Sequence, residues 1–404
     1  MTEPKSPLDL GSLPDFNADK PDELPTIGFE SDPENPFAED SESILTRFWK
    51  SIKGSWTTKQ APMASAFSPA LLHIRALEAA SQFNVRGEDA IVAVIDSGCW
   101  ADHPNLRGRV LPGVAFLGGQ SSTDTSDSYG HGTSVAGLIA GNANLGVAPK
   151  AKILPIKVIR DNRDTTNLMD RIAAALEWLV GQPNLVAVNI SLGNDENYSS
   201  LASLPAELTS SHHRISTAIT ALRQARIPIV AAAGNAYAMH ASSVGMCYPA
   251  VIPEIVSVGA VHSSASVTNT TYSFGNAKTF QSHLDAMAPF SQRLPQTSNQ
   301  AFTRLIAPGA PVLVTHADGR FTSESGTSLA APLVAGVIAL MQQLNIRTRG
   351  TRAECREIEN WIMQGAKKVV DAPGGHVNVN NTGATFCRLD AFGALNQVAQ
   401  ASTP

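Results

Sequence analysis

The stretch I-V-A-V-I-D, residues 91–96, decides the fold class of this chain. Its first five residues are apolar without interruption, which is typical of a strand buried on both faces of a sheet. Further runs that are apolar at most positions follow, at residues 153–158, 186–190, 227–233, 255–260 and 312–315. Strands buried in this way usually run parallel, and parallel strands need crossover helices between them.

Two of the intervals between these runs carry apolar residues at helical spacing. They are Leu168, Ile172, Leu176 and Leu179 in one interval, and Ile215, Ile219 and Leu222 in the other. The alternation predicts one α/β domain, with a mainly parallel central sheet and helices on both faces.

Composition points to a globular protein with a large core, since 43% of the 404 residues are hydrophobic and 16% are charged. No apolar run is expected to reach the length of a membrane span, and the N-terminus lacks the pattern of a secretory signal. Four cysteines form no C-x-x-C pair, and they are Cys99, Cys247, Cys355 and Cys387. We therefore expect free thiols and a cytoplasmic protein, with export by an unrecognised route as the alternative.

Charge divides the chain into two parts. Residues 1–42 hold twelve acidic residues, two lysines and seven prolines, a net charge of −10, which leaves +5 on the remainder. This composition predicts a disordered tail. In residues 43–58, Ile44, Phe48 and Ile52 recur at helical spacing, which favours a short helix packed on the main domain over a membrane-surface helix. We expect residues 1–60 to form an extension and residues 61–404 the main domain.

Polar residues follow three of the predicted strands. Asp96 ends the first run, Ser191 follows residues 186–190, and Asn235 comes after residues 227–233 and Gly234. Each could simply cap a turn. Because ligands bind beyond the carboxyl ends of parallel strands, their joint occurrence predicts a site.

Two further motifs add a base and a nucleophile. His131 opens H-G-T-S-V-A-G (131–137), and Ser328 lies among small residues in G-T-S-L-A-A-P (326–332). A serine hydroxyl needs a neighbouring base to attack a carbonyl, and histidine is the usual one. The lack of bulk around Ser328 leaves room for that carbonyl, and Pro332 is expected in the first helical turn, where proline is tolerated.

The motifs A-V-I-D-S-G (93–98), H-G-T-S-V-A-G and G-T-S-L-A-A-P resemble the subtilisin-like serine proteases, whose triad has the chain order Asp, His, Ser. The resemblance covers about residues 70–398 and includes H-P-N-L (103–106), Y-P-A (248–250), A-P-G (307–309) and R-L-D-A-F-G-A-L (388–395). It implies a three-layer α/β fold and a serine endopeptidase that works through an acyl-enzyme.

The resemblance also implies roles for single residues. Ser328 would be the nucleophile, His131 the base and Asp96 its partner, with Asn235 in the oxyanion hole. Ser191, Leu192 and Gly193 would pair with an extended substrate. Ala232, Ala233 and Gly234 would line the P1 pocket, and Cys247 at its floor predicts a medium-sized apolar P1 residue.

Some segments depart from the family pattern. The family's folded pro-domain is not recognisable, so residues 1–60 are either a removable, regulatory extension that docks on the domain or a tail without such a role. Residues 263–286 are extra, and we expect a surface loop there. The segment 141–149 is shorter than the loop that holds calcium in many relatives. We therefore expect no required cofactor. The sequence does not indicate calcium, although the Asp and Asn residues scattered through the loops leave a weaker calcium site as the alternative.

Other functions fit the sequence less well. A binding module on this fold would be expected to have lost a triad residue, and none is lost. An α/β-hydrolase esterase would carry G-x-S-x-G and a metalloprotease H-E-x-x-H, and both motifs are absent. The lack of a basic cluster disfavours nucleic-acid binding.

Overall fold

A computed structural model describes residues 68–402, apart from residues 143, 161–164, 265–266, 297–300, 317 and 373–374. The predictions for the acidic tail and for the amphipathic segment 43–58 lie outside the described residues. The resemblance, in contrast, falls almost entirely within them.

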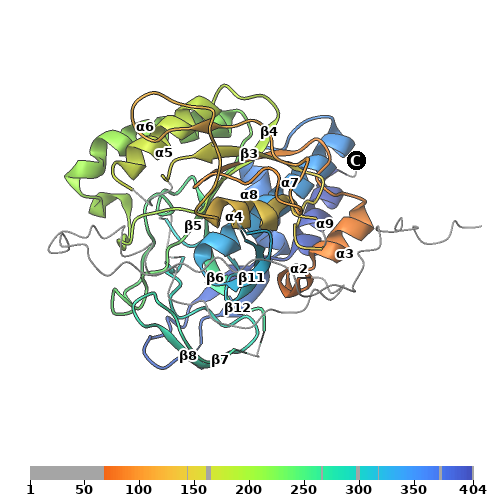
Figure 1. Cartoon of the computed structure of the whole chain (residues 1–404). Coiled ribbons are helices and arrows are strands. Elements are labelled where there is room, and N and C mark those ends of the chain that lie inside the picture. The colour runs from red at the N-terminus through yellow and green to blue at the C-terminus, as the bar shows by residue number, and fades with distance from the viewer. Residues whose placement is uncertain are drawn as a thin grey trace, which may run out of the picture. The chain divides into compact units, whose positions relative to one another are not determined.

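A sheet of nine strands forms the centre of the described part of the chain (Figure 1). Its spatial order is β12 (Lys367–Val370), β13 (Thr385–Arg388), β9 (Leu305–Pro308), β6 (Val256–Val261), β5 (Ile229–Ala232), β4 (Leu185–Ile190), β1 (Ile91–Asp96), β3 (Lys152–Lys157) and β2 (Val114–Ala115). Neighbouring strands run parallel, except for the antiparallel pair β12 and β13. The expected mainly parallel sheet is confirmed.

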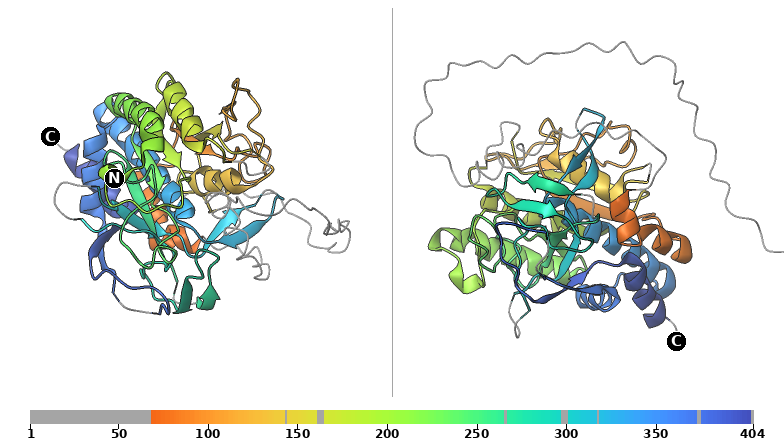
Figure 2. Two further views of the ribbon diagram at one scale, coloured as in Figure 1. Left: turned by 90° about the vertical axis from the view of Figure 1, so that its left-hand side faces the viewer. Right: turned by 90° about the horizontal axis from the view of Figure 1, so that it is seen from below.

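Helices cover both faces of this sheet, because alternate side chains of each strand point to opposite faces. Val92 and Val94 of β1 pack in the same core as helices α2 (Pro69–His73), α3 (Ala76–Phe83), α4 (His131–Ala140), α7 (Thr327–Arg349), α8 (Cys355–Gly365) and α9 (Ala391–Ala401). Ala93 and Ile95 pack with α5 (Leu168–Leu179) and α6 (Thr209–Gln224), which lie side by side (Figures 1 and 2). Two single-turn 3₁₀ helices, η1 (Leu201–Ser203) and η2 (Ala206–Leu208), precede α6.

Two segments differ from expectation. Residues 312–315 form strand β10 (Val312–Thr315), but β10 pairs with β11 (Phe321–Glu324) in a separate antiparallel hairpin and is not part of the parallel sheet. The expected surface loop at 263–286 contains a second hairpin, β7 (Thr268–Thr271) with β8 (Lys278–Gln281). Threonine-rich sequence favours strands when a partner strand is available, which explains the second difference.

Helix α7 is long and apolar enough to cross a membrane, and 89% of its most apolar window is buried inside the protein. The expectation that no run reaches this length is therefore wrong. Strands of the sheet pack against α7, and so do helices α4 and α9. These surroundings are those of a core helix.

Candidate active site

Asp96 and His131 meet where strand β1 ends and helix α4 begins. The His131 Nδ1 lies 2.8 Å from the Asp96 Oδ1, and the two side chains are 4% and 0% exposed. Gly132 permits this approach, since a Cβ on it would lie 2.0 Å from the Gly98 carbonyl oxygen. The pair predicted from sequence is therefore in hydrogen-bond contact.

The surroundings of His131 favour its protonated form. Burial opposes protonation, but the charge and hydrogen bond of Asp96 outweigh it and raise the pKa of His131 above its ordinary value. A base that takes a proton from serine becomes an imidazolium, so this environment stabilises the state that catalysis passes through.

Asp127, which the sequence analysis missed, holds the start of helix α4. Its Oδ1 accepts hydrogen bonds from the Ser97 hydroxyl (2.9 Å) and the Gly130 N–H (2.8 Å). Its Oδ2 accepts from the N–H (2.9 Å) and the hydroxyl (2.7 Å) of Thr133. An acidic residue just before a helix is a capping signal that could have identified it.

Ser328 lies in the first turn of α7, and Asn235 lies beside it. The Asn235 Oδ1 accepts hydrogen bonds from the Thr327 N–H and hydroxyl, both at 2.9 Å. This fixes the orientation of the amide, so that its Nδ2 faces the space next to Gly326. A Cβ at Gly326 would lie 2.9 Å from Ser328 Oγ, 3.6 Å from Asn235 Nδ2 and 3.8 Å from the Ser328 backbone N.

That point beside Gly326 explains the small residues in the motif. Gly326 has a φ of 164°, which is extended backbone that any residue can adopt, so conformation does not require glycine there. The missing side chain leaves a space that Ser328 Oγ, Asn235 Nδ2 and the Ser328 backbone N surround. Among the described residues no backbone hydrogen bond uses the Ser328 N–H, as expected near a helix start.

The Ser191 side chain holds the first turn of α7, a role that the sequence analysis did not predict. The reason lies in Pro332, which was expected in the first turn of α7. It is the sixth residue of the helix, beyond the first turn, so that expectation was wrong. Proline lacks the N–H that would bond to the Ser328 carbonyl. The Ser191 hydroxyl donates to that carbonyl instead, at 2.7 Å, and itself accepts from the Asn189 amide.

The two backbone segments that were expected to bind substrate flank Cys247. Leu192 is 1% exposed, and no hydrogen bond among the described residues uses the backbone groups of Leu192 or Gly193. On the other side, the Cys247 N–H and thiol bond to the carbonyls of Ala233 and Ala232. A Cβ added to Gly193 would lie 2.5 Å from the sulfur of Cys247. A Cβ added to Gly234 would lie 3.0 Å from the Cβ of Cys247.

Cys247 is an uncharged group at this position. Burial, with a smaller contribution from the charge of Asp195, raises its pKa to about 12. The thiol therefore stays protonated at neutral pH and acts as an apolar wall between Gly193 and Gly234.

Glu324 is a second residue that the sequence analysis missed. It ends strand β11, four residues before Ser328, and is 8% exposed. Burial raises its pKa to about 7, against the opposing effect of His131. It is the one charged residue between Arg320 and Arg347, and this isolation in an apolar stretch was a usable signal.

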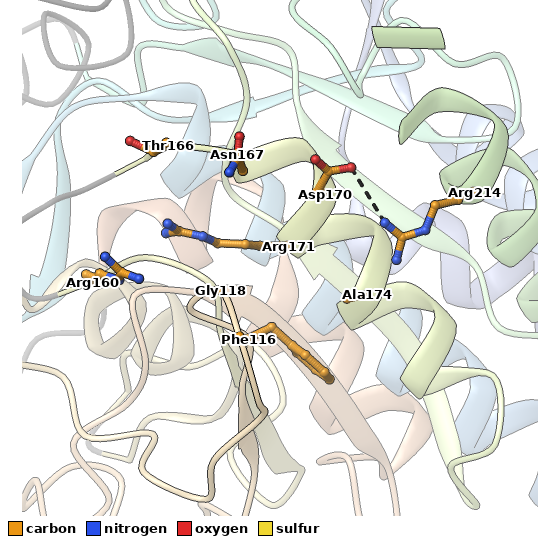
Figure 3. A pocket seen from close by; sticks show the side chains of 10 residues that line it. Phe116, Gly118, Arg160, Thr166, Asn167, Asp170, Arg171, Ala174 and Arg214 are labelled. Carbon is orange, nitrogen blue, oxygen red and sulfur yellow. Dashed lines mark ion pairs between the residues drawn. The ribbon is translucent and has the colours of Figure 1, made fainter. Parts of the chain in front are cut away.

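A separate pocket of about 480 Å³ lies over the start of α5 (Figure 3). Phe116, Arg160 and Arg171 line it, and Asp170 there forms an ion pair with Arg214 at 3.5 Å. It includes none of the predicted site residues.

Among the described residues no group of three or more His, Cys, Asp or Glu side chains could hold a metal ion. The expectation that no cofactor is required stays a prediction.

Comparisons with known proteins agree with this geometry. The model of the subtilase family matches residues 87–384. The intracellular serine protease of Paenibacillus polymyxa is 31% identical over 265 residues, which cover 64% of this chain and 68% of that protein. Subtilisin DY of Bacillus licheniformis is 31% identical over 260 residues, 63% of this chain and 77% of the relative. The major intracellular serine protease of Bacillus subtilis is 28% identical over 271 residues, 64% of this chain and 70% of the relative. The chain therefore belongs to the subtilase family and is a subtilisin-like serine endopeptidase.

Proposed function

We propose that this endopeptidase cleaves peptide bonds with a triad of Asp96, His131 and Ser328 through an acyl-enzyme intermediate. The observation that carries the proposal is the space beside Gly326, which Ser328 Oγ, Asn235 Nδ2 and the Ser328 N–H surround. A scissile carbonyl in that space meets a nucleophile and two hydrogen-bond donors at once.

The steps follow from the contacts of each residue. Ser328 Oγ attacks the carbonyl carbon while His131 takes its proton, and Asp96 stabilises the resulting imidazolium through the 2.8 Å contact. The oxygen of the tetrahedral intermediate accepts hydrogen bonds from Asn235 Nδ2 and the Ser328 N–H. His131 then gives its proton to the leaving amine, and water hydrolyses the acyl-enzyme by the same route.

The substrate binds as an extended strand. The backbone groups of Leu192 and Gly193 are available for pairing, which supports β-strand addition on this segment. Ala232, Ala233 and Gly234 form the opposite wall of the P1 pocket. Cys247 between the walls favours P1 side chains of small to medium size without charge.

The chain extension and the compartment are parts of the same proposal. Two relatives are named as intracellular serine proteases, and Cys99, Cys247, Cys355 and Cys387 are buried free thiols in the structure. Both facts support a cytoplasmic enzyme. The net charge of −10 on residues 1–42 against +5 on the remainder supports docking of residues 1–60 on the peptidase domain.

Substitution of Ser328 tests the triad. We expect Ser328→Ala to abolish labelling by a fluorophosphonate and nearly all casein hydrolysis, while thermal unfolding stays close to that of the native protein. His131→Ala should lose about as much activity, and the double variant little more, because the residues act as a unit. Turnover of Ser328→Ala near the native rate would refute the assignment.

A further inference from the structure

Gln292 is a fully buried polar residue that contacts the chain on both sides of Asn235. Its backbone N–H donates to the carbonyl of Gly234 at 2.9 Å. Its side-chain Oε1 accepts a hydrogen bond from the N–H of Ala236 at 3.4 Å. Gly234 and Ala236 are the residues directly before and after Asn235, so the backbone that carries the Asn235 side chain has Gln292 as its partner at both ends.

The close approach of Gln292 explains the glycine before Asn235. Gly234 has a φ of 109°, in the region that favours glycine. A Cβ added to Gly234 would lie 1.9 Å from the Oε1 of Gln292. The space that a side chain at position 234 would need is therefore the space in which the Gln292 amide lies.

Two acceptors fix the orientation of the Gln292 amide. Its Nε2 donates to the carbonyl of Glu196 at 2.9 Å and to the Oδ1 of Asn197 at 2.8 Å. A flipped amide would set Oε1 against these two oxygens, so the contacts define which end faces Ala236. Residues 196–197 follow the segment 191–193, which we propose pairs with the substrate. Gln292 therefore connects this part of the chain with the loop that carries Asn235.

Thr327 holds Asn235 from the side of the nucleophile. Its N–H and hydroxyl donate to the Asn235 Oδ1, and its Oγ1 accepts from the Gly234 N–H at 3.2 Å. Thr327 thus fixes the side-chain amide of Asn235, whereas Gln292 holds the backbone on either side of it. A donor that must lie about 2.7–3.1 Å from a developing oxyanion needs both to be in place.

We propose that Gln292 is a positioning residue for the oxyanion hole, which holds the backbone of Asn235 so that Asn235 Nδ2 reaches the oxygen of the tetrahedral intermediate. This inference rests on the proposed function, since it needs Asn235 to donate that hydrogen bond. Because the bond to the oxyanion forms in the transition state, loss of the correct position lowers kcat and leaves KM nearly unchanged.

Substitution of Gln292 tests the proposal. Gln292→Met keeps the backbone hydrogen bond and the approximate length of the side chain but removes the amide. We expect kcat on a peptide substrate to fall by about 10–100-fold, the order of loss for a misplacement of about 1 Å, with KM within about twofold of native. Asn235→Ala should itself lower kcat. In the Asn235→Ala background, Gln292→Met should change kcat by less than about twofold, because no donor is left to position.

Gln342→Met is the matched control for the loss of a buried amide. Gln342 is also 0% exposed, its Oε1 accepts from the Ala353 N–H at 2.8 Å, and its Nε2 donates to the Ala353 carbonyl at 3.2 Å. It lies on α7, about 21 Å along the helix from Ser328. Gln342→Met should lower the midpoint of urea unfolding about as much as Gln292→Met does, and it should leave kcat close to native.

A second variant decides the question if Gln292→Met fails to fold. Gln292→Asn keeps an amide but shortens the side chain by one methylene, so that it cannot bond to both Ala236 and Glu196, and kcat should again fall at nearly unchanged KM. A native kcat in either folded variant would overturn the inference, as would a loss of kcat that is equally large in the Asn235→Ala background. An Asn235→Ala enzyme with native kcat would instead count against the role of Asn235 in the proposed function.

Discussion

Addition of one methyl group at Gly326 should remove catalysis and leave the fold intact. The Cβ of Gly326→Ala would lie 2.9 Å from Ser328 Oγ and 3.6 Å from Asn235 Nδ2. An oxyanion must lie about 2.7–3.1 Å from its donors, so the methyl group would occupy the volume that the oxygen needs. Removal of one such donor in subtilisin itself lowers kcat by about 10²–10³, a figure borrowed from that relative, and blocking the space should do at least as much.

The stability of the variant should change little. The φ of 164° is open to alanine, and alanine reduces the entropy of the unfolded chain, which stabilises by about 0.4–1 kcal/mol at a compatible site. The tight 2.9 Å contact with Ser328 Oγ opposes this gain. We expect the free energy of unfolding to stay within about 1 kcal/mol of the native value.

Three measurements check the prediction: kcat/KM on a peptide substrate, the rate of fluorophosphonate labelling of Ser328, and urea unfolding. Gly181→Ala is the matched control, because an added Cβ there would meet nothing within 4 Å. A Gly326→Ala enzyme with kcat/KM within fivefold of native would show that the reacting carbonyl does not use this space. Loss of activity together with unfolding would show that Gly326 is needed for structure.

Three further predictions concern residues around the site and the extension. Asp127→Asn should move the acid limb of the pH profile of kcat/KM to lower pH, because loss of the negative charge of Asp127 lowers the pKa of His131. An unchanged acid limb would show that Asp127 has a structural role only. Glu324→Gln should be more stable than the native protein at neutral pH. The pKa of Glu324 is about 7 in the folded protein and 4.5 ordinarily, so the free energy of unfolding of the native protein falls between about pH 4.5 and 7, by up to about 3 kcal/mol. The difference in Tm between the variant and the native protein should therefore grow over that pH range. A chain that starts at Ala61 should show higher initial activity than the full chain at low salt, and addition of residues 1–60 in trans should lower it less as salt increases. Equal activity of the two chains at low salt would argue against inhibition by the extension.

The central sheet was predictable because its strands are apolar on both faces. Residues 91–95 are apolar at every position and residues 186–190 at every position except Asn189, and both became central strands. The run 312–315 is also largely apolar, yet it forms a separate hairpin with β11. An apolar run predicts a buried strand but does not indicate which sheet the strand joins. Strand β9 joins the parallel sheet instead, and it was not among the strands predicted from the sequence.

The site was predictable where chemistry requires a particular residue type at a helix start or a strand end. Asp96, His131 and Asn235 satisfy that condition, and the structure brings Asp96 to His131 and Asn235 to the Ser328 loop. Asp127 and Glu324 act through burial and through neighbours distant in sequence. Local sequence could have singled out both residues, but it does not show which groups the fold sets beside them, such as the Ser97 hydroxyl beside Asp127.

The contact between Ser191 and Ser328 joins the end of strand β4 to the first turn of α7. Pro332 deprives the Ser328 carbonyl of its helical partner, and the Ser191 hydroxyl replaces that partner from the end of strand β4. A buried carbonyl without any partner would be unfavourable, so the replacement ties the first turn of α7 to this segment. Leu192 and Gly193 follow directly, and no hydrogen bond among the described residues uses their backbone groups. Under the proposed function, the hydrogen bond of Ser191 joins the segment that would pair with the substrate to the turn that carries Ser328.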